Sequence, residues 1–253
     1  MAVALDVENR EQDARKPDKQ EQGKTLDDRT VSQAVTIMTT EHYTLQGIRA
    51  ATISDSSSRA SLFLGTVSST LVALAFVGQV SKTTKDLGEP FYIFSLVLFP
   101  SLLFLGLVTF DRVLQSAIED TVAAHGINRI RHYYVEIAPQ LAPYFMQSTH
   151  DDDAGAAQNM GVASAWWQMF LDTAGMIAVI NSVIAGVSAG LIVSRLVVNK
   201  PLALYVLIGA AAFLLSLALH QRYQAVQWRR TDVRMPVMFP SPKAQQAVKP
   251  RRR

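Results

Sequence analysis

The chain has 253 residues, of which 49% are hydrophobic and none is cysteine, and its formal net charge is +3. Without cysteine it forms no disulfides and uses no thiolate chemistry. The apolar residues are concentrated in four blocks, each close to the ~20 residues needed to cross ~30 Å of hydrocarbon, and three of them contain no formal charge. This argues against a soluble domain and predicts an all-α, polytopic membrane protein with four transmembrane helices in two hairpins plus cytosolic amphipathic helices. The blocks are 60–80, 91–110, 174–198 and 201–219.

The charge is distributed unevenly. After the fourth block there are nine basic residues and one acid, Asp232, whereas the rest of the chain is mildly acidic. Because basic flanks of membrane helices are retained on the cytoplasmic side, we expect both termini in the cytoplasm and the chain in the plasma or inner membrane. The basic tail over 220–253, which includes Arg229 and Arg230, is predicted to bind anionic lipid headgroups, with nucleic acid the less favoured partner.

The N-terminal part is polar. Residues 1–24 are crowded with charge, which predicts a disordered tail. Thr25 followed by Asp28 is typical of a helix start, since the hydroxyl can cap a backbone amide and the carboxylate favours the positive helix end. Apolar residues at helical spacing then predict an amphipathic cytosolic or interfacial helix over 25–59, ending at the polar run 54–58. Its apolar stripe has three alternative partners: the membrane surface, later cytosolic helices or a second copy of the chain.

The first hairpin is expected over 60–110. Small residues recur at every fourth position of its first span, and this spacing places them on one ridge where a second helix can approach closely. Thr66 and Thr70 add hydroxyls that can bond within their own helix or to a neighbour. The alternative is a hydrated path lined by Thr66, Ser69, Thr70 and Gln79. Pro100 falls within the second span and predicts a kink. The small-residue row is Ser61, Gly65, Ser69 and Ala73.

The helical pattern does not stop at the end of the second span. It continues into a predicted cytosolic helical segment over 111–146. We expect a break at Gly126, and after it a short seam of apolar residues that Pro139 and Pro143 end.

Residues 147–165 predict an exposed acidic linker. Its three aspartates, 151–153, lack the additional oxygen ligands and the turn glycine of a calcium site. No metal site is therefore predicted.

The second hairpin is expected over 166–219, with a tight turn between its spans. Trp166 and Trp167 are predicted to lie at headgroup level before the third span, and Arg195 to snorkel at its far end. Asn181 is expected to be buried and to hydrogen-bond to another helix, with a lining or substrate contact as the alternative. The third span carries a second small-residue row, a candidate to pack against the first: Ala174, Ala178, Ser182, Gly186, Gly190 and Ser194.

No catalytic motif, phosphate-binding loop or cofactor site is recognisable. In the order of its elements the chain resembles small multi-span bacterial membrane proteins, including effector modules of the SLATT type; this resemblance rests on layout and implies no functional residue. Two functions are left open. The first is a non-enzymatic membrane scaffold or interaction protein presenting cytosolic helices, and the alternative is an oligomeric ion-conducting pore or membrane effector. A homo-oligomer is possible under either, and the protein partner is unknown.

Overall fold

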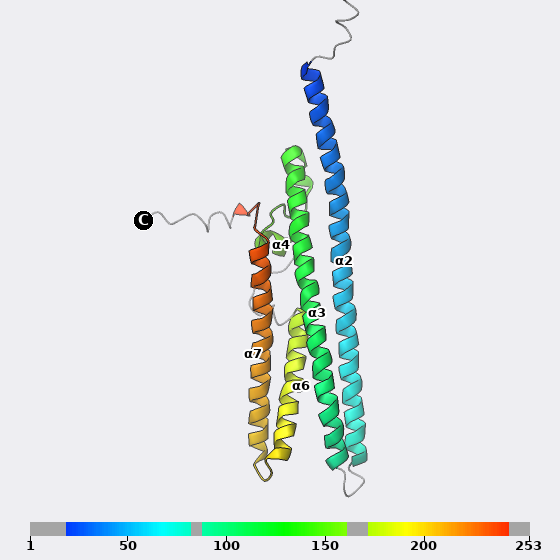
Figure 1. The fold of residues 1–253 in the computed structure, drawn as a ribbon, viewed down its shortest axis with the longest axis vertical. Coiled ribbons are helices and arrows are strands. Elements are labelled where there is room, and N and C mark those ends of the chain that lie inside the picture. Colours follow the sequence, from blue (N-terminus) through cyan, green and yellow to red (C-terminus); the bar gives the residue numbers. More distant parts are fainter. Residues whose placement is uncertain (1–18, 82–87, 161–171, 243–253) are drawn as a thin grey trace, which may run out of the picture.

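A computed structural model describes residues 19–81, 88–160 and 172–242, and in this part of the chain every regular element is helical (Figure 1). Four of these helices are long and apolar enough to cross a membrane, which confirms the all-α prediction and is consistent with a multi-pass membrane protein. The elements are α2 (Lys19–Ser81), α3 (Gly88–Ile137), η1 (Pro139–Tyr144), α4 (Asp153–Met160), α6 (Thr173–Leu196) and α7 (Leu202–Arg234).

Two regions are distinguished by their composition. The apolar region comprises residues 60–79 of α2, 91–110 of α3, α6, and 202–219 of α7. The head region comprises residues 28–59 of α2, 111–137 of α3, η1, α4 and the described residues from 220 onward. The helices α2 and α3 run through both regions without a break (Figure 1).

The longest contact in the fold is an antiparallel seam between α2 and α3. Buried or half-buried residues recur along each helix at alternating spacings of three and four, the pattern that lets two helices remain in contact over many turns. Cross-helix contacts fix the direction, because Thr39 lies beside Tyr134 while Gly78, much later in α2, lies beside Phe91. On α3 the seam residues are Ser95, Phe99, Leu102, Gly106, Thr109, Val113, Ser116, Asp120, Ala123, Ile127, Ile130 and Tyr134.

The chemistry of the seam changes between the two regions. In the apolar region α2 contributes Phe63, which is only 1% exposed. In the head region the Arg49 Nε atom lies 2.8 Å from the Asp120 Oδ1 atom, and the pair is only partly exposed. The seam is therefore apolar where the helices carry no charge. In the head region, where water can reach the edge of the seam, it contains an ion pair.

The helix α2 is longer than predicted at both of its expected boundaries. It begins at Lys19, so residues 19–24 are helical and Thr25 is not its cap, while residues 1–18 lie outside the described residues. The polar run 54–58 also stays helical and joins the two predicted segments. The reason is that the run is part of the seam: Asp55 accepts a hydrogen bond from Ser116 of α3 and pairs with Arg59 one turn later.

The predicted break at Gly126 is wrong, since α3 continues to Ile137. A Cβ atom at this position would lie 2.9 Å from the Leu45 Cδ1 atom, so the glycine serves the seam by making room for a leucine. Pro100 lies inside the same helix, and the kink expected there stays a prediction. The helix does end before Pro139, as predicted, and η1 follows.

The pair α6 and α7 forms the other side of the apolar region. A short turn at Asn199, which has a φ of 65°, connects the two helices. Glycines then bring their backbones together, because a Cβ atom at Gly186 would lie 2.7 Å from the carbonyl oxygen of Gly209 and 3.1 Å from Phe213 Cβ. Tyr205 closes the end by donating a hydrogen bond to the Val197 carbonyl at 2.6 Å.

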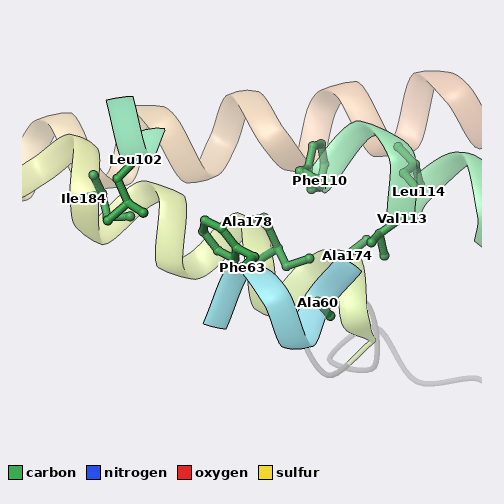
Figure 2. Packing of buried hydrophobic residues seen from close by; sticks show 10 residues of the cluster. Ala60, Phe63, Leu102, Phe110, Val113, Leu114, Ala174, Ala178 and Ile184 are labelled. Carbon is green, nitrogen blue, oxygen red and sulfur yellow. The ribbon is translucent and has the colours of Figure 1, made fainter. Parts of the chain in front are cut away.

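The apolar core lies where α2, α3 and α6 meet (Figure 2). Phe63 of α2, Leu102 of α3 and Ile177 of α6 are each at most 5% exposed. By contrast, the most apolar window of α7 has no buried residue. The helix α7 is thus attached to the bundle mainly through α6.

This packing predicts different outcomes for two glycine substitutions. Gly186→Leu would force side-chain atoms into the α7 backbone, so we expect the free energy of unfolding to fall by about 1–3 kcal/mol. Gly65→Leu is the matched control, because no atom lies within 4 Å of a Cβ at that position. Thermal unfolding of both variants in detergent, followed by circular dichroism, measures the difference. Equal losses would contradict the α6–α7 glycine contact.

Candidate functional site

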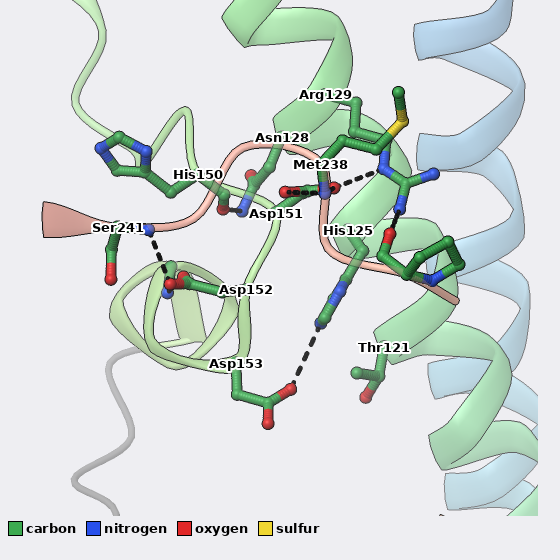
Figure 3. Close-up of polar contacts among 12 residues, drawn as sticks. Thr121, His125, Asn128, Arg129, His150, Asp151, Asp152, Asp153, Met238 and Ser241 are labelled. Carbon is green, nitrogen blue, oxygen red and sulfur yellow. Dashed lines mark hydrogen bonds and ion pairs between the residues drawn. The ribbon is translucent and has the colours of Figure 1, made fainter. Parts of the chain in front are cut away.

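The strongest polar site of the head region is a clasp that holds the segment after α7 (Figure 3). We call it the tail clasp: Arg129, Asp151 and Asp152, with the segment 236–241. Asp151 is fully buried, and its carboxylate accepts hydrogen bonds from the backbone amides of Met238 at 3.0 Å and Phe239 at 2.6 Å. The tail is therefore held by its main chain.

Arg129 of α3 completes the clasp from the other side. Its Nε atom lies 2.5 Å from Asp151 Oδ2, and its second guanidinium nitrogen donates to the carbonyl of Pro236 at 2.6 Å. The ring of His132, one turn further along α3, stacks on Phe239 with a centroid distance of 3.9 Å. The helix α3 thus contacts the tail by a hydrogen bond and ring stacking, and it contacts Asp151 by an ion pair.

Asp152 has a double role. Its Oδ1 atom accepts a hydrogen bond from the Gly155 amide at 2.8 Å, which caps the first turn of α4. Its Oδ2 atom accepts one from the Ser241 amide at 2.7 Å. The carboxylate therefore couples the start of α4 to the docked tail.

The predicted exposed acidic linker is accordingly wrong for two of its three aspartates. Asp151 is 0% and Asp152 is 6% exposed, whereas the Asp153 side chain is 90% exposed. Residues 153–160 form α4, and 161–165 lie outside the described residues. The sequence pattern failed because the partners of these carboxylates are backbone amides of a segment almost ninety residues away.

The environment of the clasp lowers both carboxyl pKa values. Burial alone would raise the pKa of Asp151, but the amides of Met238 and Phe239 and the Arg129 guanidinium outweigh it. Burial would also raise the pKa of Asp152, but hydrogen bonds from Ser241 and Gly155 to its carboxylate outweigh the effect of burial. The pKa of Asp152 therefore also lies below its ordinary value. With every carboxylate oxygen occupied by a donor, the clasp is suited to holding a segment rather than to proton transfer.

A second polar layer joins the apolar region to the head region. Tyr223 of α7 donates to Asp111 of α3 at 2.7 Å, and Gln224 donates to Asp172 at 3.1 Å. Asp172 in turn caps α6 by accepting from the Gly175 amide, as expected for an acid at a helix start. We call these four side chains the polar collar.

Asn181 is the most unusual residue of the apolar region. Its side chain is fully buried, as predicted, but neither amide atom has a hydrogen-bond partner, so the expected bond to another helix is absent. Any Cβ atom at Gly106 of α3 would overlap the Asn181 amide. The amide therefore occupies the space that the glycine leaves.

The two small-residue rows do not meet in this chain. In the α6 row, Ser182 donates to Ser216 of α7 at 3.2 Å and Gly186 contacts Gly209 of α7, whereas Ala174 and Ala178 lie in the core with residues of α2 and α3. In α2, Ser61, Gly65 and Ser69 are exposed and Ala73 is half-buried. They point away from α6 because Phe63 and Leu74 occupy the inner face of α2.

The hydroxyls of α2 also fall on different faces. Thr66 and Ser69 are exposed and donate to carbonyls of their own helix at 2.9 Å each. Thr70 is 8% exposed and faces the seam. A path that all three line is therefore not formed within this chain.

The predicted headgroup residues are placed in part. Arg195 is exposed near the end of α6, with its guanidinium 4.5 Å from the ring centroid of Tyr92. Arg229 and Arg230 are exposed on α7, which continues to Arg234. Trp166 and Trp167 lie outside the described residues.

Comparison of the chain with protein-family models, curated proteins and solved structures finds no match. Within the described residues, no group of three or more His, Asp or Glu side chains is arranged to hold a metal ion.

The lowered pKa values predict how tail docking depends on pH. The ordinary value is 3.8, so the stability from Asp151 and Asp152 is fully present above about pH 5 and is lost as the pH falls below 3.8. Spin labels on Cys introduced at Met146 and Met238, both exposed, should give a narrow distance distribution at neutral pH that broadens only below pH 3.8.

Two variants test the cause of this transition. Asp151→Asn removes the charge and should broaden the distribution at neutral pH, whereas Glu41→Gln, an exposed acid of α2, should leave it narrow. A transition centred above pH 5 would contradict the assignment to these two carboxylates.

Proposed function

We propose that this chain is a non-enzymatic membrane scaffold. In this proposal the apolar region crosses the bilayer as two hairpins, and the head region stands in the cytosol with both termini. The α2–α3 seam is the observation that carries it, since the same pair of helices continues through both regions. A continuous helix pair fixes the orientation of the head relative to the bilayer, which is what a scaffold requires.

The head offers an extended surface for a partner. Beyond Asp111, α3 continues to Ile137, which at 1.5 Å per residue gives a reach of about 40 Å. On α2 the side chains of Ile37, Tyr43 and Ile53 are 65%, 69% and 56% exposed. Exposed apolar side chains on a rigid rod suit contact with a protein partner or a second copy of the chain.

The lipid contact proposed for this scaffold involves the polar continuation of α7. Arg229 and Arg230 are exposed there, beyond the apolar end of the helix. Basic side chains near a bilayer surface attract anionic headgroups at ~1 kcal/mol each. Anionic lipid is therefore the proposed lipid partner of this end of the chain.

An oligomeric pore is the alternative, and one observation favours it. Ser61, Gly65 and Ser69 form an exposed row of small residues on α2, and no atom lies near a Cβ built at Gly65. Such a row permits close packing of a helix from another copy. A ring of copies could place the exposed hydroxyls around a shared path.

The membrane arrangement predicts the labelling of single cysteines, for which the cysteine-free chain gives a clean background. Val198→Cys, in the turn between α6 and α7, should react with a membrane-impermeant maleimide in intact cells. Tyr43→Cys and Met146→Cys should react only after permeabilisation, and buried Ala178→Cys in neither case. Labelling of positions 43 and 198 from the same side would exclude the proposed topology.

Ion flux separates the scaffold from the pore. Purified chain in liposomes should leave the permeability to potassium unchanged if it is a scaffold, and Gly65→Leu should have no effect on flux. Under the pore alternative, flux should appear and should change in Gly65→Leu. Flux that is abolished by this substitution would contradict the scaffold proposal.

A further inference from the structure

A pocket in the head region lies apart from the tail clasp. It has a volume of about 360 Å³ and lies between α3, α4 and α7. Volumes of this size suit small organic ligands. The polar lining comes from Thr121 and His125 of α3, Asp153 of α4, and Thr231 and Asp232 of α7.

His125 is the feature of this pocket that the fold does not explain. The residue is only 5% exposed, and its Nε2 atom has no hydrogen-bond partner. The nearest acid atom, Asp153 Oδ1, lies 3.8 Å away, too far for a hydrogen bond (Figure 3). A buried ring nitrogen without a partner is costly unless something else in the pocket bonds to it.

The charge of the lining is negative. Asp153 and Asp232 contribute two carboxylates, and among the described lining residues there is no lysine or arginine. The Asp153 side chain is 90% exposed, so a ligand can reach it from solvent. The pocket therefore favours a cation over an anion or a neutral molecule.

The rest of the lining favours an organic cation over a metal ion. The apolar part of the lining comes from Trp228, Met235, Ala156 and Ala157. The imidazole and the two carboxylates are not arranged as a ligand set for a metal. An aromatic and thioether wall suits the apolar body of an amine and can also contact its charged end.

We propose that this pocket binds a small protonated amine, with its ammonium at Asp153 and Asp232, its apolar body on Trp228 and Met235, and a polar group at His125 Nε2. The site is independent of the scaffold function, because none of these side chains belongs to the seam or the tail clasp. Such a site would let the head region bind a small ligand in addition to a partner at its exposed surface.

The test uses Trp228 as an internal probe. The chain has three tryptophans, so Trp166→Phe with Trp167→Phe leaves Trp228 as the only one. In nanodiscs of zwitterionic phosphatidylcholine at neutral pH, benzylamine should change its fluorescence with saturation. Benzyl alcohol, which matches benzylamine in size but lacks the charge, should bind at least about tenfold more weakly.

Variants then locate the charge requirement. Asp153→Asn with Asp232→Asn should weaken benzylamine binding by about tenfold, since each exposed charge contributes modestly. Glu119→Gln, an exposed acid of α3 outside the pocket, should leave the affinity unchanged. Circular dichroism verifies that each variant is folded.

Several outcomes would overturn the proposal. These are an unsaturable response to benzylamine, equal binding of benzyl alcohol, or an affinity that the double variant does not change. The comparison of benzylamine with benzyl alcohol needs no pocket variant, so it is decisive even if the double variant fails to fold. Zinc chloride is titrated in parallel, and saturable zinc binding without a response to benzylamine would also overturn the proposal.

Discussion

The α2–α3 seam is the constraint on which the rest of the structure depends. Its alternating spacing of three and four fixes both the partner and the register, because a shift by one residue would move every seam side chain to another face. The register can be followed from Gly78 and Phe91 at one end to Thr39 and Tyr134 at the other. The same helix-to-helix spacing is maintained by apolar packing at Phe63 in the apolar region and by the ion pair of Arg49 with Asp120 in the head region.

The other two long helices are attached to this pair mainly through α6. The helix α6 docks against α3, where Asn181 fills the space left by Gly106, and against α2 at Phe63. The helix α7 then packs on α6 through glycine contacts and has no buried residue in its apolar window. A buried amide without partners is unfavourable for stability, so Asn181 does not strengthen the contact in which it lies.

The sequence allowed prediction of the elements that depend on local chemistry. Four apolar blocks and the stop before Pro139 are each determined by residues close together in the chain. It did not allow prediction of what glycines and charges do across helices. Considered alone, Gly126 favours a break in the helix, but in the fold it packs against Leu45. In the sequence Asp151 is typical of a solvated linker, but in the fold it accepts hydrogen bonds from the amides of Met238 and Phe239. No local pattern contained those partners.

The clasp and the collar together explain how α7 is held. Between Leu107 of α3 and Leu215 of α7 an apolar groove of about 590 Å³ separates the two helices. They are in contact at its polar end, where the rings of Phe110 and His220 lie edge to face at 4.8 Å and Tyr223 bonds to Asp111, and beyond it, where Asp151 and Arg129 hold the tail on α3. These hydrogen bonds fix the position of the polar end of α7 relative to α3. The apolar length of α7 is held by α6, because glycines bring the two backbones together there, and not by a close fit along α3.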